Sequence, residues 1–470
     1  MKTECKTNFI KFQPLNNKEI IAAFDGGKIT TDAGALLLRE IEKRNSFIDD
    51  FSKCFTDYRN QEKIEHTITE LLAQRIFGIC LGYEDLNDHD ELRHDPLLAA
   101  ACDKIDPLGN NRELLRDKGK ALAGKSTLNR LELSQEGDLG NERYKKIEAN
   151  FNAIENYFIN VFLKTYPDKN PKEIIIDLDA TDDPIHGNQE GKFFHGYYDC
   201  YCYLPLYIFC GNYLLGAKLR RSNIDGCEGS IEELERIIPM IREKWPNVRI
   251  IIRGDSGFCR EKIMNWCENN GVDYIFGLSK NDRLKKMIEK EMIEAKFEYK
   301  KTIQPAKIYK DFKYKTLESW SKEKRVIGKA EYLELGENPR FIVTTLKEDE
   351  IEAKKLYEEI YCARGDMENR IKEQQLYLFA DRTSTAYMRS NQLRLWFSCV
   401  AYVILNELRI HGLKGTECEK YQCDNIRLKL LKIGAAVKIS VRRIYISLSE
   451  SYPYKAMFLR VMENIFASTA

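Results

Sequence analysis

The 14 cysteines of the chain include no Cys-x-x-Cys pair, and Cys200-x-Cys202 and Cys418-x4-Cys423 lack matching His or Cys partners. This pattern favours buried free thiols in a reducing compartment over a structural zinc site. A run of about 18 apolar residues is also missing, so the sequence predicts no membrane span. Because the first residues lack the apolar core of a signal peptide, we expect a cytoplasmic protein.

The chain has almost no net charge, formally +1 from 74 basic and 73 acidic residues. A global attraction to nucleic acid is thereby excluded, and any such binding must come from local patches. Two common catalytic motifs are absent as well. The sequence has no Gly-x-Ser-x-Gly turn, and its glycine cluster at residues 24–28 lacks the spacing of a phosphate-binding loop.

A chain of 470 residues is too long for one compact core, and its patterns change along its length. Residues 1–150 have mostly helical periodicity, including a helix predicted over residues 65–81. Strand-like and helical runs alternate in residues 151–290, and residues 347–412 are helical. Residues 291–346 are β-rich, with many Lys and aromatic residues, and residues 413–470 are helical and basic. We therefore predict a multi-domain α/β protein with a mixed sheet.

Three acidic residues stand out in this pattern. Asp179 and Asp255 each end a β-type run, and Glu368 lies in a long helical pattern. A lone buried acid costs several kcal/mol, so strands rarely end in one without a partner. Hard cations prefer oxygen ligands, and pairs of such ions carry out phosphoryl transfer on nucleic acids. The three acids therefore suggest a shared Mg²⁺ site.

The order of these acids along the chain matches the ribonuclease-H-like fold, which has one Asp on its first strand, one at the end of its fourth and an acid on a later helix. Asp177 shares a strand face with Asp179, because side chains alternate along a strand. We favour Asp179, since the carboxyl edge of a strand opens onto the cleft in α/β sheets. Taken singly, a strand-end Asp is more often a turn or cap residue.

The predicted helix presents one face that carries Tyr361, Arg364, Glu368, Lys372 and Gln375. One interpretation is a solvated face with a Glu368–Lys372 ion pair. The other has Glu368 on metal and Arg364 and Lys372 on DNA phosphates. The upstream aspartates favour the second interpretation.

The β-rich segment is basic and aromatic, with ten Lys or Arg residues and only three acids between Lys300 and Lys329. Cations for phosphates and rings for unstacked bases indicate nucleic-acid binding, although a solvated charged hairpin has the same composition. A second basic stretch runs from Arg427 to Arg443. The candidate DNA-binding residues of the first segment are Lys313, Lys315, Trp320, Lys324 and Arg325.

Two histidines, His186 and His195, follow Asp179 closely in the chain. They could line a cleft beside Asp179, or they could be structural hydrogen-bonding residues. The sequence favours neither reading.

Three blocks carry a family resemblance: residues 177–187 around the first aspartate, residues 253–258 around the second, and Tyr361-x2-Arg364-x3-Glu368. They resemble the bacterial insertion-sequence transposases of the DDE type, in the large group marked by a Tyr-x2-Arg-x3-Glu signature. Residues 81–89, 122–130 and 391–396 are similar to the same group, so the resemblance covers nearly the whole chain. The wider signature ends in a Lys seven residues after the Glu, where this chain has Gln375. Lys372 is the other candidate for that role.

The resemblance implies a ribonuclease-H-like catalytic core in residues 151–290 and 347–412. The core would be interrupted by an insertion domain at 291–346 and flanked by a DNA-end-binding domain at 1–150. It further implies that Asp179, Asp255 and Glu368 are catalytic and hold two Mg²⁺ ions, which Mn²⁺ can replace. Tyr361 is implied as a DNA contact, and Trp320 is the candidate platform for a flipped base in a hairpin intermediate.

The partners implied by the resemblance are double-stranded DNA, as inverted-repeat ends and target, and a second copy of the chain in the DNA-bound complex. The expected location is a bacterial cytoplasm, at the nucleoid, with no membrane partner. Two alternatives stay open. One is a nuclease of the same fold that does not join strands, and the other is a DNA-binding protein that has lost catalysis.

Overall fold

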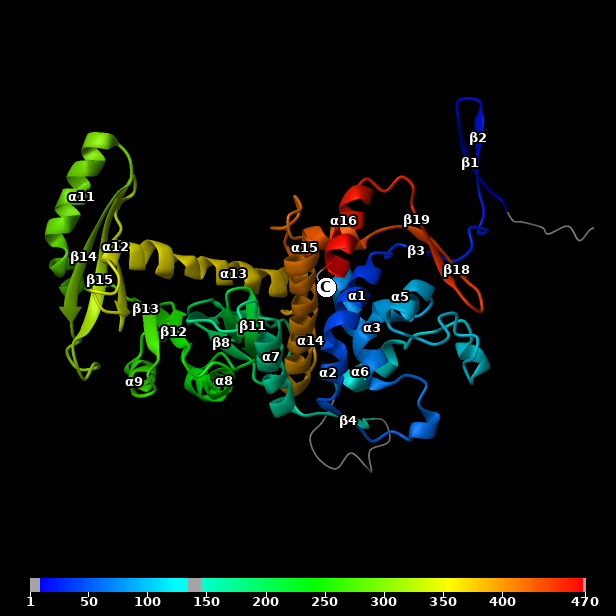
Figure 1. Ribbon diagram of the computed structural model, residues 1–470, viewed down its shortest axis with the longest axis horizontal. Coiled ribbons are helices and arrows are strands. Elements are labelled where there is room, and N and C mark those ends of the chain that lie inside the picture. The colour runs from blue at the N-terminus through cyan, green and yellow to red at the C-terminus, as the bar shows by residue number, and fades with distance from the viewer. Residues whose placement is uncertain (1–8, 134–144, 468–470) are drawn as a thin grey trace, which may run out of the picture. The chain divides into compact units, whose positions relative to one another are not determined.

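The computed structural model describes residues 9–133 and 145–467, and the chain forms two compact units (Figure 1). One unit combines the two ends of the chain, up to residue 148 and from residue 400 onwards. The other comprises residues 149–399 and contains the large sheet. None of the helices in the described ranges has both the length and the apolar character needed to cross a membrane.

The terminal unit is helical in its first part, as predicted. Helix α3 begins with a capping box, in which the Thr67 hydroxyl accepts from the Glu70 N–H and the Glu70 carboxylate accepts from the Thr67 N–H. It ends at Gly82, whose φ of 94° suits a residue without a Cβ. The helices of this part are α1 (Ala35–Asn45), α2 (Phe47–Ser52), α3 (Ile68–Leu81), α4 (His89–Leu92), α5 (Pro96–Ala101) and α6 (Lys125–Glu132).

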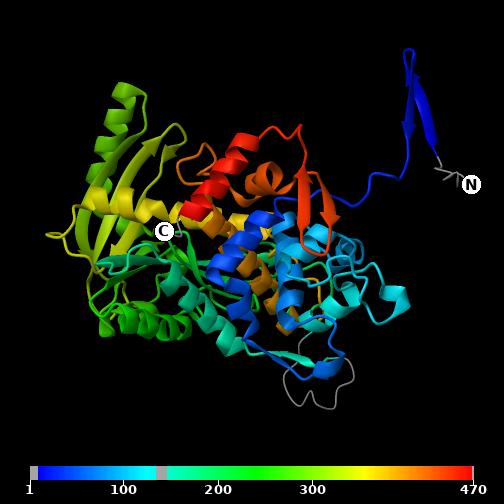
Figure 2. The same ribbon diagram turned by 45° about the vertical axis from the view of Figure 1, so that its right-hand side comes forward.

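The terminal unit also contains short strands that the sequence did not predict. A hairpin of β1 and β2 is exposed along its whole length and stands apart from the rest of its unit in both views (Figures 1 and 2). The strands are β1 (Ile10–Leu15), β2 (Lys18–Ala22), β3 (Ile29–Thr30), β4 (Phe55–Asp57), β18 (Ala435–Ile439) and β19 (Ile444–Leu448), with β5 (Ile147–Ala149) at the boundary.

The C-terminal segment packs with the N-terminal one. Strand β18 pairs with both β3 and β19, and α16 (Lys455–Ala467) contacts α1. The predicted helical region at 413–470 is present, but it also includes a strand pair, and it shares a unit with the residues up to 148. Strands about 400 residues apart in sequence can pair, and a local pattern cannot reveal that. The short helix α15 (Cys423–Ile426) continues into the π-helical η10 (Arg427–Leu431).

The sheet of the second unit confirms the predicted ribonuclease-H-like core. Its first five strands lie in the order β11–β10–β6–β12–β13. Strand β6 is antiparallel to β10 and parallel to β12, which in turn is parallel to β13. The bounds are β6 (Glu173–Ala180), β10 (Leu206–Cys210), β11 (Tyr213–Lys218), β12 (Arg249–Gly254) and β13 (Asp273–Leu278). A side sheet contains β7 (Asp183–Pro184), β8 (Phe193–His195) and β9 (Cys200–Tyr203).

The two faces of this sheet pack against different helices. Ile174, Ile176 and Leu178 face a core shared with α7 (Phe151–Thr165), α8 (Ser230–Lys244) and α9 (Glu261–Asn269). Ile251 and Ile275 face the opposite side and pack against the helical segment that begins near residue 353. Because side chains alternate, Asp177 and Asp179 lie on that second face. The helix bearing Glu368 therefore covers the side of the sheet to which both aspartates point.

Residues 291–346 extend the core sheet and do not form a separate β domain. Strand β17 pairs with β13, β15 pairs with β17, and β14 forms the outer edge of a 9-stranded sheet. Helix α11 covers β14 and β15 (Figure 2), so the start of the segment is helical and not β-type as predicted. The elements are α10 (Asp282–Met287), α11 (Glu289–Thr302), β14 (Ala306–Tyr314), β15 (Lys324–Leu333), β16 (Gly336–Glu337) and β17 (Arg340–Thr344).

The long helix predicted to bear Glu368 is present, but it is not a regular α-helix. Two π-helical turns interrupt it, at η6 and η8, and such turns are frequent at functional sites. In chain order it contains α12 (Ala353–Lys355), η6 (Leu356–Tyr361), η7 (Cys362–Arg364), α13 (Gly365–Lys372) and η8 (Glu373–Tyr377). Helix α14 (Met388–Glu407) and the π-helical η9 (Leu408–Gly412) follow.

Candidate active site

Asp177, the first of the two aspartates on β6, is fully engaged in a buried ion pair. Arg253 lies beside it in register on β12 and donates to both carboxylate oxygens, at 2.5 and 2.7 Å. The Arg253 guanidinium also donates to the Ile360 carbonyl of η6. Burial raises the pKa of Asp177, and Arg253 opposes that effect. Asp177 and Arg253 therefore join the sheet to the helix above it.

Asp179 lies two residues further along β6 and has a different partner. Its Oδ2 atom is 3.5 Å from Nη1 of Arg364, and its side chain is 14% exposed. Its pKa is raised from 3.8 to about 7, mainly by burial; Arg364 opposes this rise, and the neighbouring carboxylates of Asp255 and Glu368 add to it. Such mutual repulsion is typical of carboxylates that share a cation.

Arg364 connects Asp179 to the helical acid. Its Nη2 atom donates to Oε1 of Glu368 at 2.6 Å, one helical turn further on. Burial lowers the pKa of Arg364, but Asp179 and Glu368 raise it more, so that the net shift is upward. The Glu368–Lys372 pair of the less favoured interpretation is not formed, since Arg364 pairs with the Glu368 carboxylate and Lys372 is exposed.

Asp255 follows β12 directly and caps the short turn after it, accepting a hydrogen bond from the Gly257 N–H at 2.8 Å. Above it, the Tyr361 hydroxyl rests on Gly277 of β13. A Cβ atom at Gly277 would lie 2.6 Å from that hydroxyl and 2.9 Å from the Ser256 N–H nitrogen. Only glycine therefore allows Tyr361 to pack this closely. The contact fixes the helix over the end of β12.

The donor set is that of a hard divalent cation, because Asp179, Asp255 and Glu368 supply only carboxylate oxygens. Within the described ranges, however, no three His, Cys, Asp or Glu side chains lie close enough together to hold an ion. The Arg364 guanidinium occupies the place between Asp179 and Glu368. These residues thus fit a cation on condition that Arg364 releases the two carboxylates.

Gln375, Lys372 and the two histidines, which were also predicted as site residues, differ in their contacts and exposure. Gln375 donates to the Asp182 carbonyl at 2.9 Å and so braces the loop after β6, whereas Lys372 makes no such contact in the described structure. His186 is exposed. The His195 ring lies 4.9 Å from that of Tyr198, whose hydroxyl donates to the carbonyl of Ala180, the residue after Asp179. His195 is thus linked through Tyr198 to the strand that bears Asp179.

Part of the predicted DNA-binding set is wrong, because its charges and rings are used inside the fold. Lys324 is buried and pairs with Glu268 at 2.7 Å, and Arg325 donates to Asp311 and to two carbonyls. Trp320 is only 4% exposed and packs edge-on against Tyr314, so it offers no free face to a base. The exposed members that remain from this set are Lys313 and Lys315.

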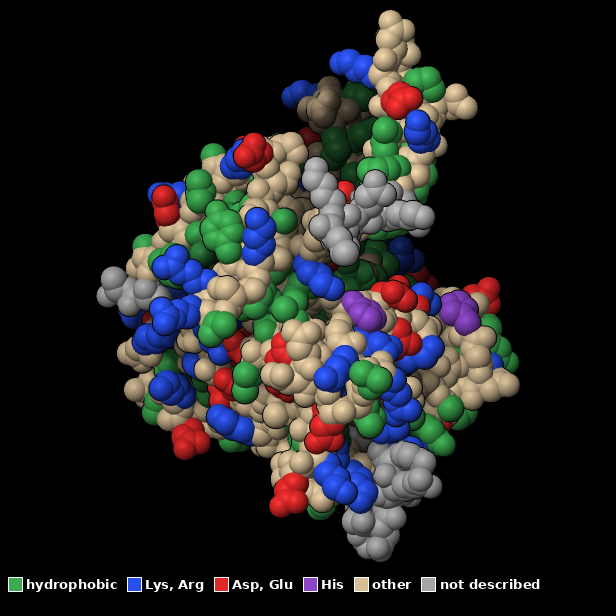
Figure 3. All heavy atoms as spheres, turned by 90° about the vertical axis from the view of Figure 1, so that its right-hand side faces the viewer, with side chains coloured by type: hydrophobic (Ala, Val, Ile, Leu, Met, Phe, Trp, Pro, Cys, Tyr) green, Lys and Arg blue, Asp and Glu red, His purple; other side chains and the backbone are tan. Residues whose placement is uncertain are grey.

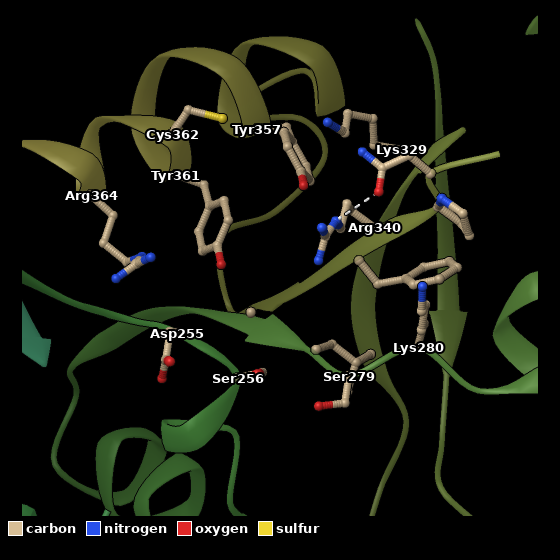
Figure 4. A pocket seen from close by; sticks show the side chains of 15 residues that line it. Asp255, Ser256, Ser279, Lys280, Lys329, Arg340, Tyr357, Tyr361, Cys362 and Arg364 are labelled. Atoms are coloured by element: carbon tan, nitrogen blue, oxygen red, sulfur yellow. Dashed lines mark hydrogen bonds between the residues drawn. The ribbon is translucent and has the colours of Figure 1, made fainter. Parts of the chain in front are cut away.

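Several residues of the site were not predicted, and one of them had a visible signal. Arg253 interrupts an apolar strand, and a charge in such a run requires a buried partner. Beyond Asp255 and Tyr361, a pocket of about 650 Å³ opens towards Lys280, Lys329 and Arg340 (Figure 4). These three residues come from separate strands or strand ends and share no sequence motif.

The surface charge agrees with the composition. On the face shown in Figure 3, basic and acidic side chains are interspersed and do not form one continuous basic field.

Comparisons with known proteins identify the family of the chain. None of the curated proteins matches it. Among solved structures, it is similar to a piggyBac transposase in a synaptic complex with hairpin DNA, at 11% identity and a TM-score of 0.39, over 86% of this chain and 80% of that one. The family described as "Transposase DDE domain group 1" matches residues 12–470. Since that match covers nearly the full length, the chain belongs to this transposase family.

Proposed function

We propose that the protein cuts DNA at the inverted-repeat ends of a mobile element and joins the freed ends to target DNA. The observation that carries the proposal is that Arg364 pairs with both Asp179 and Glu368, while the carboxylate of Asp255 lies near enough to raise the pKa of Asp179. In a chain of this family, that arrangement corresponds to a phosphoryl-transfer site. The raised pKa of Asp179 supports it, because clustered acids without a cation repel one another.

In this mechanism the three carboxylates would hold divalent ions, Mg²⁺ or Mn²⁺. Bound there, such ions would activate the attacking oxygen and neutralise charge on the leaving oxygen. Arg364 turns from Asp179 and Glu368 to a non-bridging phosphate oxygen, where its planar fork can donate two hydrogen bonds. Tyr361, which rests on Gly277, keeps this part of the helix above Asp255. Asp177 stays with Arg253 and takes no part in the transfer.

The proposed partner is duplex DNA, and we propose a dimer of the chain on a pair of ends. One copy of the chain carries one set of the three acids, in residues 149–399, and joining two ends to a target calls for two sets. The terminal unit is proposed to bind the ends, which leaves the large sheet to position the reacting phosphate.

The proposal is tested with labelled DNA from the segments that flank the gene, incubated with the protein and Mg²⁺. Cleavage and joined products are expected from the wild-type protein, and neither from Glu368→Gln, which should still bind the ends. Glu359→Gln is the matched control, since Glu359 is an exposed acid on the preceding turns of the same helix. Cleavage without joining would favour the nuclease alternative. Binding without cleavage would favour a protein that has lost catalysis.

A further inference from the structure

The charged residues that line the pocket beyond Asp255 are mostly positive. Its lining includes one acid, Asp255, and four cations, Lys280, Lys329, Arg340 and Arg364. Figure 4 shows Arg364 and Asp255 at one end and Lys280, Lys329 and Arg340 at the other, with Tyr361 between them. A cavity that joins the acid cluster to an array of cations is suited to an anionic ligand that passes the reacting centre.

Two of these cations lack a counter-charge. Lys329 already pairs with Glu331 at 2.8 Å. Among the residues that the structure describes, Arg340 donates to the neutral Asn338 side chain, at 3.1 Å, and to no acid, and it is exposed. Lys280 is exposed directly after β13, and neither it nor Arg340 has an ion pair within the described ranges. Their charges are therefore available to a ligand.

Two aromatic rings of the pocket are too buried to stack on a base of a ligand. Tyr357 is 5% exposed and lies against Tyr309 and Tyr361, and Phe341 is 3% exposed. The Tyr361 hydroxyl is held on Gly277. The walls thus offer cations and hydroxyls, whereas the rings of Tyr357 and Phe341 are covered, which favours recognition of phosphates over stacking of bases on these two rings.

The size of the pocket limits which ligands can enter it. About 650 Å³ lies within the range of pockets that hold one small ligand, roughly 300–1,000 Å³. A DNA duplex cannot enter such a space, whereas roughly one or two nucleotides of a single strand can.

We propose that this pocket holds an unpaired strand segment next to the reacting phosphodiester, and that Lys280 and Arg340 bind its phosphates without regard to base. The inference rests on the proposed function and names a second part of the same site. It gives the separated strand a defined path, from the acid cluster to the edge where β17 begins.

Binding is measured by fluorescence anisotropy in EDTA, so that no cleavage occurs. The probes are a blunt DNA end and the same end with three unpaired nucleotides on one strand or the other. The wild-type protein should bind one of the extended ends about tenfold more tightly, because charge-assisted hydrogen bonds of this kind contribute about that much. Lys280→Ala and Arg340→Ala should lose this preference and lower the salt slope by about 0.7 each. Lys290→Ala is the control, with an exposed lysine on α11 outside the pocket.

An extension of abasic sugar-phosphates distinguishes phosphate from base recognition. It should bind as tightly as the normal extension, and a loss to the level of the blunt end would overturn the proposal. Tripolyphosphate should compete only weakly. Competition at the affinity of the extended DNA would assign the pocket to free polyphosphates instead.

Cys362 gives a measurement that needs no altered protein. Its thiol lines the pocket and is the exposed one among the cysteines that the structure describes. Extended DNA should slow its reaction with a maleimide, and the blunt end should not. Equal protection by both would contradict the proposal. Both binding measurements are made without metal and do not depend on cleavage. If the wild-type protein failed to cleave DNA, the proposed function would be refuted, but the comparison of extended and blunt DNA ends would still test the pocket.

Discussion

Arg253 and Asp177 face each other in register on β12 and β6, and the guanidinium binds both oxygens of the carboxylate. The Asp177 carboxylate is therefore neutralised inside the protein. Asp179, two residues away, shares the Arg364 guanidinium with Glu368. Two aspartates on one strand face thus have different environments. Asp177 joins the sheet to the helix, and Asp179 lies beside the other two candidate acids.

This difference leads to the first prediction. Asp177→Ala should lower the free energy of unfolding by about 3–5 kcal/mol, because it leaves the buried Arg253 charge unpaired. Asp179→Ala should leave the fold intact and abolish cleavage of DNA ends. Urea denaturation and a cleavage assay on both variants measure the two effects. If Asp177→Ala were stable and inactive while Asp179→Ala cleaved DNA, the assignment of the strand acid would be reversed.

The pKa of Asp179 makes a prediction about pH. Its carboxyl is neutral in both states below 3.8, and between 3.8 and about 7 only the unfolded state ionises. The stability that Asp179 contributes is therefore present at low pH and lost as pH rises towards 7. Without metal, Asp179→Asn should stabilise the protein by roughly 1–3 kcal/mol at pH 8 and by less at pH 5.

Thermal unfolding in EDTA at the two pH values measures this effect. Mg²⁺ or Mn²⁺ should raise the Tm of the wild-type protein at pH 8 and change that of Asp179→Asn much less, since metal binding requires the ionised carboxylate. An Asp179→Asn variant that is less stable than wild type at pH 8 would contradict the prediction.

The lysines of the β14–β15 hairpin should separate into two classes. Reversing the charge of the exposed Lys313 and Lys315 should weaken DNA binding and lower its salt slope by roughly one unit per lost phosphate contact. Lys324→Ala should instead destabilise the fold, because it leaves Glu268 without one of its buried partners. Binding isotherms at several salt concentrations, with denaturation curves of each variant, distinguish the two. An unchanged slope for Lys313 and Lys315 would assign them to an ordinary solvated surface.

Trp320 should behave as a core residue. Trp320→Ala removes a large side chain packed against Tyr314 and should cost about 3–5 kcal/mol of stability. Nicking and second-strand cleavage should then decline together, in proportion to the folded protein. Trp320→Phe keeps most of the packing and should restore both steps. Accumulation of nicked DNA with a stable Trp320→Phe variant would show that the ring does contact a base.

Part of the fold could be predicted because its signals are local. The β-branched runs that end in Asp179 and Asp255 predict buried strands, and their order with the later helix predicts a ribonuclease-H-like sheet. The helical spacing of Arg364 and Glu368 likewise predicts that both lie on one helix face, and in the structure they form an ion pair. Each of these inferences depends on residues within one element or on the order of elements.

The predictions that were wrong concern residues whose surroundings come from distant parts of the chain. A basic and aromatic composition does not reveal that Glu268 neutralises Lys324 or that Tyr314 covers Trp320. The extension of the core sheet by β17 and β15, and the pairing of β18 with β3, also depend on strand partners far away in sequence.

The sequence by itself determined the main strands and helices of the core, their order and the three candidate acids. Tertiary structure alone decided which charges are free. Asp177 and Lys324 are neutralised by partners on neighbouring strands or helices, whereas Lys280 and Arg340 have none in the described residues and flank a common pocket. The physical reason is that a charge is available for function only where the fold leaves it without a partner. Pairing depends on distances of a few ångströms between residues that the chain brings together only on folding.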